Sequence, residues 1–329
     1  MNQDQGPQLL TVPASAQGQR LDNFLLRHLK GVPRSLVYRL VRKGAIRVNG
    51  RRAKVENRIS GGDEVRVPAL DRPGEATGAG ARTIHVPEGM LRTLRQSVIH
   101  DDEDYLVLDK PAGVAVHGGS GLAYGLIEAM RLLYPATALE LGHRLDRETS
   151  GCLVLTKSRR GLTAFHDALR SGNVSKRYLA LVAGRWEGPA RRCDLPISQE
   201  RDETGRRQIR ALEGLAIEGS QGESARRATS LFAPIECFPA FTLMDVDIGT
   251  GRTHQIRVHG RALGHPVAGD HEYGDPAANR LARGLGLKRM FLHAQAIRFP
   301  DWQGDQLLFS APLPADLEQV LQALSDQAP

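Results

Sequence analysis

Two amphipathic segments near the start of the chain predict a pair of short helices. Apolar residues recur at helical spacing over 21–29, until Pro33 breaks the pattern. A second helix is predicted from Ser35 to Gly44, because apolar residues again share one stripe and glycine suits a left-handed helix end. The chain therefore begins with two helices joined by a short connection.

Short strands are predicted directly after these helices. The stretch 45–48 leads into Asn49-Gly50, a strong signal for a hairpin turn. Two glycines and an aspartate at 61–63 then precede the alternating residues 64–67. Together these patterns predict a small module of two helices and a hairpin.

The rest of the chain mixes strand and helix patterns. Strands are predicted over 105–108, 152–156, 178–182 and 241–246, and helices over 126–133, 161–169 and 315–324. No repeat of fixed period is present. This mixture indicates an α+β protein.

The polar and glycine-rich stretches divide the chain into segments. A length of 329 residues suits one large and one small domain. We expect a flexible tail at 1–17, a small domain at 18–68, a linker at 69–95 and a larger domain at 96–325.

Positive charge is concentrated in the small domain. The chain carries 44 Lys and Arg against 37 Asp and Glu, a net charge of +7, whereas residues 18–68 alone hold 13 against 4, or +9. Such a cationic block is typical of a module that contacts phosphates, although a solvated surface would give the same composition. The candidate phosphate-contacting residues lie on the second helix and the following turn, and they become candidate RNA-binding residues through the resemblance given below: Arg34, Arg39, Arg42, Lys43, Arg47, Arg51 and Arg52.

Several protein classes are disfavoured by the sequence. Cys152, Cys193 and Cys237 are far apart and form no C-x-x-C pair, which argues against a disulfide framework and a zinc site. The first twenty residues lack the features of a secretory signal, and no apolar stretch is long enough to span a bilayer. We expect a cytoplasmic protein with no membrane partner.

An aspartate between two arginines is the first candidate for chemistry. Asp146 precedes the apolar run 151–155, which predicts a rigid strand behind the loop. Local sequence alone favours a turn or helix-cap role for Asp146, and the strand behind the loop together with a second polar cluster downstream shifts the balance toward chemistry. With Glu148 it would also form a carboxylate pair of the kind that glycosyl chemistry uses.

A second polar cluster lies far downstream, at 249–259. On a helix, Arg257 would share one face with Thr253 and His254, and an arginine aimed at a buried aspartate keeps that aspartate ionised. His254 and His259 lack the spacing of helical zinc ligands, so no metal is expected.

A glycine cluster at 117–125 invites comparison with dinucleotide-binding loops. Its spacing differs from G-x-G-x-x-G, and the flanking segments do not alternate as in a doubly wound sheet. A turn that permits close approach of backbone is the preferred interpretation.

Four motifs resemble those of one family, the pseudouridine synthases of the ribosomal large-subunit type. Residues 143–151 are similar to its H-R-L-D-x-x-T-S-G loop, 252–259 to R-x-H-Q-I-R-x-H, 269–274 to G-D-x-x-Y-G, and 289–294 to R-x-x-L-H-A. The small domain resembles the RNA-binding module first described in ribosomal small-subunit protein four. The likeness extends over about 18–325.

The resemblance implies a function and a set of roles. Asp146 would be the catalytic carboxylate, Arg257 its partner, Tyr178 the base-stacking residue, Leu292 a wall of the base pocket, and Arg144 a residue that displaces the target base. The implied fold joins the RNA-binding domain to a mixed, largely antiparallel β-sheet with flanking helices. The implied reaction isomerises uridines of large-subunit ribosomal RNA, free or within an assembling particle, by a monomer that needs no cofactor or metal.

Two regions depart from the family pattern or carry no pattern. The stretch 222–232 lacks the lysine of the family's G-K-x-A-x-T-x-F element, and the arginine-rich residues 185–222 suggest an irregular surface loop. Beside a synthase, two alternatives stay open on the residues: an RNA-binding assembly factor without chemistry, and a glycoside or nucleoside hydrolase using Asp146 and Glu148. A nicotinamide enzyme is a more distant alternative.

Overall fold

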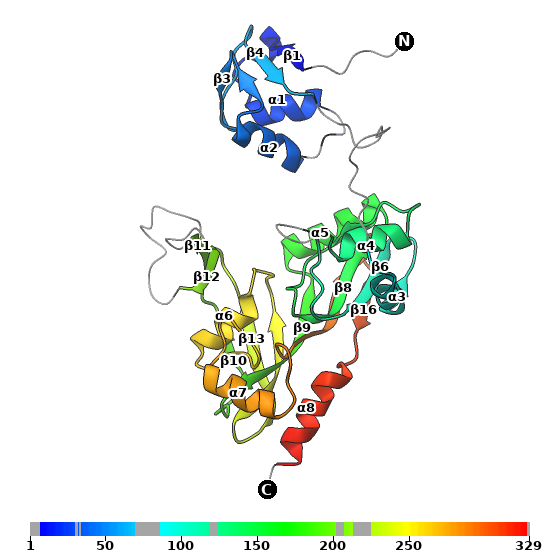
Figure 1. The fold of residues 1–329 in the computed structure, drawn as a ribbon, viewed down its shortest axis with the longest axis vertical. Helices are drawn as coiled ribbons and strands as arrows, with labels where there is room; N and C mark the ends of the chain where they lie inside the picture. The colour runs from blue at the N-terminus through cyan, green and yellow to red at the C-terminus, as the bar shows by residue number, and fades with distance from the viewer. Residues whose placement is uncertain are drawn as a thin grey trace. The chain divides into compact units, whose positions relative to one another are not determined.

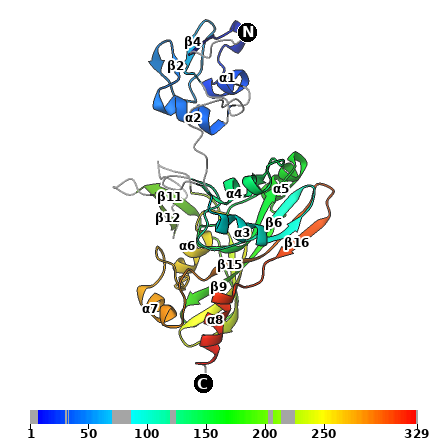
Figure 2. The same cartoon turned by 45° about the vertical axis from the view of Figure 1, so that its right-hand side comes forward.

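The computed structural model of the chain describes residues 7–29, 32, 34–69, 86–118, 124–201, 207–212 and 225–327. The chain divides into two compact units, Met1–Thr83 and Ile84–Pro329, each with its own core (Figures 1 and 2). Within the described residues, no helix has the length and apolar character needed to cross a membrane.

The first unit packs two helices against a small sheet. Its elements are β1 (Gln8–Thr11), a short 3₁₀ turn (Ala14–Ala16), α1 (Leu21–His28), α2 (Arg34–Lys43), β2 (Arg47–Val48), β3 (Arg51–Arg52) and β4 (Glu64–Val67), with sheet order β1-β4-β2-β3. Asn49 and Gly50 both have positive φ, 49° and 74°, as a tight hairpin turn requires. The predicted helices and hairpin are confirmed.

The expected flexible tail is wrong over part of its length. Residues 8–11 form β1, which pairs antiparallel with β4, and Val12 is 1% exposed in the core of the unit. Burial of Val12 and Ala16 supplies the apolar contact that orders this segment. The ordered part of the first unit therefore begins before residue 18.

The second unit is built on one large sheet. Its strands are β5 (Val98–Asp101), β6 (Tyr105–Lys110), β7 (Glu140–Leu141), β8 (Ser150–Thr156), β9 (Ser175–Ala183), β10 (Arg191–Cys193), β13 (Ser230–Cys237), β14 (Phe241–Ile248), β15 (Leu292–Pro300) and β16 (Gln306–Ser310). The path is β10-β13-β14-β9-β15-β8-β6-β5, with β16 beside β15 and β7 beside β8. Among the described strand pairs of this sheet, only β15 and β8 run parallel, which confirms a mixed, largely antiparallel sheet.

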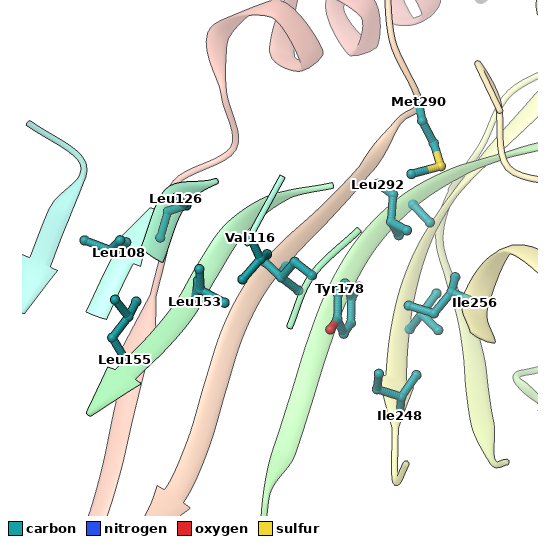
Figure 3. Close-up of a cluster of buried hydrophobic side chains, with 14 of the residues drawn as sticks. Leu108, Val116, Leu126, Leu153, Leu155, Tyr178, Ile248, Ile256, Met290 and Leu292 are labelled. Atoms are coloured by element: carbon teal, nitrogen blue, oxygen red, sulfur yellow. The ribbon is translucent and has the colours of Figure 1, made fainter. Parts of the chain in front are cut away.

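Both faces of this sheet are buried, because alternate residues of each strand enter different cores. The helices are α3 (Glu88–Gln96), α4 (Leu126–Leu133), α5 (Arg159–Ser171), α6 (Gln255–Ala262), α7 (Pro276–Gly284) and α8 (Ala315–Ser325). Residues of α3, α4 and α6 join one face, which also holds Tyr178 and Leu292 (Figure 3). Residues of α5, and of α7 with α8, cover two parts of the other face.

Two segments are more regular than the sequence indicates. Helix α3 forms within the expected linker 69–95, because Leu94 is fully buried and the helix packs against α4. The expected irregular loop at 185–222 contains β10 and a hairpin of β11 (Ile197–Arg201) and β12 (Arg207–Ala211). Ile197 and Ile209 of the hairpin are buried against Val258 of α6, which explains its order.

Candidate active site

Asp146 lies in the loop that enters strand β8. Its backbone oxygen accepts a hydrogen bond from Thr149 at 3.2 Å, and the next carbonyl, that of Arg147, accepts from Gly113 at 2.8 Å. The side chain of Asp146 is 22% exposed. The loop thus presents a partly buried carboxylate from a segment anchored at several points.

A buried lysine contributes to that anchoring. The Nζ atom of Lys110 donates to the carbonyls of Pro111, Val114 and Arg147 at 2.8, 2.9 and 3.1 Å. Burial lowers the pKa of Lys110 to about 7, although the nearby negative charges of Glu148 and Asp146 act to raise it. Lys110 therefore joins the end of β6 to the loop that carries Asp146.

Two adjoining cavities meet at Asp146. The larger, about 400 Å³, has charged and imidazole groups on its walls, among them Arg147, His271 and Glu272. The smaller, about 60 Å³, is lined by Tyr178 and Leu292. Asp146 and Arg144 are among the residues that line both, so the carboxylate lies where the cleft meets the smaller cavity, a slot whose walls mix apolar side chains with polar ones such as Thr149 and Gln255.

The slot is built from four elements of one sheet face. Tyr178 from β9, Leu292 from β15, Ile248 from β14 and Ile256 from α6 gather there (Figure 3). Tyr178 is 6% exposed, and burial together with the nearby charge of Asp146 raises the pKa of its hydroxyl. The slot offers an aromatic face and aliphatic walls beside a carboxylate.

Arg257 reaches Asp146 from helix α6, as the sequence predicts. Its Nη1 lies 3.5 Å from Oδ2 of Asp146. A shorter pairing joins it to Asp270, with Nε and Nη2 donating to the two carboxylate oxygens at 2.6 and 2.8 Å. The principal partner of Arg257 is therefore Asp270, and Asp146 is its more distant neighbour.

The environment of Arg257 keeps the guanidinium charged. Burial would lower its pKa, but the hydrogen bonds and charge of Asp270 outweigh burial, so the pKa of Arg257 is raised. Burial alone would raise the pKa of Asp270, and Arg257 instead holds it below its usual range. The pair remains ionised inside the protein.

Three further residues of the site carried no assigned role in the sequence analysis. Glu272 accepts from Nη2 of Arg257 at 3.2 Å, the Tyr273 ring lies 4.7 Å from the guanidinium, and His254 Nδ1 is 2.9 Å from the Tyr273 hydroxyl. Glu272 and Tyr273, like Asp270, belong to the motif 269–274, so that motif was the available signal. Arg144 is exposed at the rim of the site.

The candidate RNA-binding residues of the first unit form an exposed set. Arg39, Arg42 and Lys43 lie on α2, Arg47 on β2, and Arg51 and Arg52 on β3, all with exposed side chains. Arg47 donates to the carbonyls of Gly44 and Gly50, and Arg52 donates to that of Lys43 at the end of α2. The side chain of Arg34 lies outside the described residues.

His259, the histidine of α6, has hydrogen-bond partners of its own. Both ring nitrogens of His259 are hydrogen-bonded, to Ser230 and to the carbonyl of Leu195. Across the described parts of the chain, no three His, Cys, Asp or Glu side chains are grouped to hold a metal ion.

The glycine cluster is held together at its ends. Backbone amides of Gly118 and Gly125 both donate to the Glu128 carboxylate, at 3.1 and 2.8 Å. Residues 119–123 of the cluster, and 222–224 of the stretch that lacks the family lysine, lie outside the described residues.

Comparisons with known proteins agree on both units. Residues 104–262 match the RNA pseudouridylate synthase family, and residues 19–65 match the S4 domain. The chain is 42% identical over 326 residues to ribosomal large subunit pseudouridine synthase C of Pasteurella multocida (strain Pm70), covering 98% of this chain and 96% of the relative. It is 41% identical over 323 residues to the protein of the same name from Escherichia coli (strain K12), covering 96% of each.

Solved structures agree with the sequence comparisons. Human RNA pseudouridylate synthase domain containing 4 is similar with a TM-score of 0.57 and 25% identity, over 72% of this chain and 96% of that one. Human RNA pseudouridylate synthase domain containing 1 is similar with a TM-score of 0.56 and 26% identity, over 74% of this chain and 99% of that one.

Proposed function

The chain belongs to the RNA pseudouridylate synthase family, and from this premise we propose that it converts specific uridines of large-subunit ribosomal RNA to pseudouridine. As an RNA pseudouridine synthase it is an isomerase. Membership of this family confirms the resemblance seen in the motifs. It favours a synthase over the two alternatives, a binding factor without chemistry and a hydrolase. The choice of ribosomal RNA rests on the names of the relatives and on the S4 domain.

The observation that carries the proposal is the position of Asp146 in one slot with Tyr178, Leu292 and Arg257. A uridine inside a helix is stacked and paired, so it must leave the stack before its glycosidic bond can be reached. In the proposal, the extracted uracil enters the slot against Tyr178, and Leu292 limits it on another side. Stacking on an aromatic ring offsets part of the energy of unstacking.

Arg144 has the exposed position that its proposed role needs. It lines both cavities and is open to solvent at their rim. A guanidinium there can contact phosphates and occupy the space that the displaced base leaves, because it is planar, charged and rich in donors.

The proposed reaction conserves atoms. The bond from the ribose C1′ to uracil N1 breaks, the base turns, and C1′ bonds to C5. The hydrogen of C5 leaves as a proton and N1 gains one. Asp146 attacks the ribose, assists departure of the uracil or adds to the ring, and each route uses an ionised carboxylate. No electrons pass to an outside acceptor, so the reaction needs no redox cofactor.

Mapping of pseudouridines tests the proposal. The purified protein is incubated with large-subunit ribosomal RNA, free or in partly assembled particles, and with small-subunit RNA as the control. Carbodiimide labelling followed by reverse transcription locates the products. We expect stops at a few uridines of the large-subunit RNA only, in the free RNA or in the particles. We further propose that the protein acts as a monomer. Modification of another RNA class, or of none, would contradict the proposed substrate.

A further inference from the structure

The segment 269–274 is a motif whose role the proposed reaction leaves open. Asp270, its second residue, has a side chain with no solvent exposure. Its Oδ1 accepts from Arg257 Nη2 and from the backbone amides of Glu272 and Tyr273 at 2.8, 2.9 and 3.1 Å. Its Oδ2 accepts from Arg257 Nε at 2.6 Å. A buried carboxylate with this many donors has a fixed orientation.

The backbone of the loop that carries Asp270 is closely packed at both ends. A side-chain carbon at Gly274 would lie 2.1 Å from the backbone oxygen of Asp270, and one at Gly269 would lie 2.2 Å from that of Arg289. Only glycine fits at either position. Asn279 of α7 completes the loop by donating to the Asp270 carbonyl and accepting from the Gly269 amide, at 2.9 and 2.7 Å.

The two hydrogen bonds from Arg257 to Asp270 also hold Arg257 in place. The guanidinium is planar, so two bonds to one carboxylate set both its position and its plane. The Nε and Nη2 atoms of Arg257 donate to Asp270. The nitrogen that faces Asp146 is Nη1, at 3.5 Å. The direction from which Asp146 meets positive charge is therefore determined by Asp270.

Asp270, and not Asp146, is the main carboxylate that neutralises the charge of Arg257. A buried guanidinium needs a carboxylate partner. If Asp146 were that partner, a short bidentate pair would occupy both of its oxygens and oppose its reaction with uridine. Because Asp270 balances the charge, Asp146 meets Arg257 only at 3.5 Å and stays 22% exposed.

We propose that Asp270 is a positioning residue, the fixed counterion of Arg257 that directs Nη1 toward Asp146 and leaves the Asp146 carboxylate open to the uridine. The inference rests on the proposed function, in which Asp146 reacts with the substrate. Asp270 itself touches no substrate in this account.

The test is Asp270→Asn with Asp275→Asn as the matched control. The asparagine keeps Oδ1, so the amides of Glu272 and Tyr273 keep an acceptor, but an amide NH₂ replaces the oxygen that accepts from Arg257 Nε. Two donors then face each other and Arg257 must move. Asp275 loses the same charge in the same loop, yet Asn preserves its bond to the Ala278 amide at the start of α7.

Two readouts are expected to separate positioning from general destabilisation. The single-turnover rate of Asp270→Asn on ribosomal RNA should fall roughly 100-fold, the effect of a small misplacement in an active site, while the Kd for RNA stays that of the wild type. In NMR spectra, the Nε–H signal of Arg257 should be protected from solvent exchange in the wild type and in Asp275→Asn, and lose that protection in Asp270→Asn.

Distinct results would overturn the inference. A wild-type rate in Asp270→Asn, an unchanged Arg257 signal, or parallel losses of rate, RNA binding and thermal stability would each contradict positioning. If the wild-type protein made no pseudouridine in any ribosomal substrate, the proposed function would fail, and Asp270 would have no reaction to serve. If wild type were active and Asp270→Asn equally so, only the role of Asp270 would be lost.

Discussion

At the scale of single residues, the site juxtaposes two environments that act on one carboxylate. Tyr178 and Leu292 supply the apolar wall of the slot, and Arg257 supplies a positive charge at 3.5 Å. The guanidinium attracts the Asp146 carboxylate, and the aromatic face of the slot favours a flat, unpaired base. Either environment alone would suit many proteins, but their meeting at Asp146 suits chemistry on an extracted uridine.

Tyr178→Leu tests the stacking role. Leucine keeps an apolar side chain on β9 but removes the aromatic face, so kcat/KM should fall roughly 10- to 100-fold, the range expected for one base-stacking contact. The binding of RNA to the first unit should be unaffected. Steady-state kinetics on ribosomal RNA provides the measurement, and an unchanged kcat/KM would exclude stacking on Tyr178.

At the scale of elements, the loop of Asp146 depends on how β8 leaves it. Gly151, near the start of β8, has a φ of 108°, and a side-chain carbon there would lie 2.2 Å from the Ala294 oxygen on the parallel neighbour β15. The same strands bring together Ser150 and His293, whose Oγ and Nδ1 are 3.0 Å apart. The close approach of β8 and β15 therefore places Leu292 and the Asp146 loop at one end of the sheet.

Gly151→Ala should destabilise the protein by more than about 2 kcal/mol, because the backbone oxygen of Ala294 must shift. Gly172→Ala is the control. Its φ is also positive, 76°, but nothing lies within 4 Å, so its loss should be about 1 to 2 kcal/mol. Denaturant unfolding measures both, and equal losses would show that the contact with β15 is unimportant.

The elements also show what the sequence could reveal. Local periodicity predicted α4 over the same residues, 126–133, and it located the strand that follows the Asp146 loop and the strand that contains Tyr178. The hairpin of β11 and β12 was missed, because its order comes from burial against α6, a contact between distant segments.

The candidate site residues were likewise predictable only in part. Asp146 and Arg257 stand in matched motifs, the resemblance implies that they pair, and their side chains lie 3.5 Å apart. The stronger pairing of Arg257 with Asp270 could not be inferred, because both residues lie in matched motifs and only the folded loop determines which carboxylate is nearer. Sequence identifies the groups, whereas packing decides which of them meet.

At the scale of the whole molecule, two units have separate tasks in this account. The first unit exposes a basic set on α2 and β3, and the second holds the reaction site. Within the described residues, Arg39, Arg42 and Arg51 form no ion pair, so their charges are available to phosphates. Most of the dependence of RNA affinity on salt should therefore originate in the first unit.

Replacement of Arg39, Arg42 and Arg51 by Gln tests this division. Each lost phosphate contact should reduce the slope of log affinity against log salt by about 0.7 to 0.9, so the triple variant should lose about 2 to 3. Replacement of Arg159, Arg280 and Arg283 in the second unit removes the same charge and should leave the slope unchanged. Equal slopes in wild type and first-unit variant would contradict the division.

The first unit should also respond to acid through Asp22. The Arg20 guanidinium hydrogen-bonds to its carboxylate, and the Tyr38 hydroxyl donates at 2.7 Å, which together hold the pKa of Asp22 well below its usual range despite burial. A lowered pKa stabilises the folded state above the unfolded value near 4, and that stability is lost as pH falls below it.

Hydrogen exchange of α1 amides in the full chain measures the effect. Between pH 6 and pH 3 the wild-type protection of α1 should decline, whereas Asp22→Asn should start lower and change less. The same decline in both proteins would assign the acid sensitivity of the first unit to other groups.

The central claim is that the Asp146 carboxylate carries out the isomerisation, and release of tritium from uracil C5 tests it most directly. Large-subunit ribosomal RNA labelled at C5, free and in particles, is incubated with wild-type protein and with Asp146→Asn, whose RNA binding is measured in parallel. The account predicts release by the wild type and none by Asp146→Asn at equal binding. Release by Asp146→Asn at the wild-type rate would contradict it.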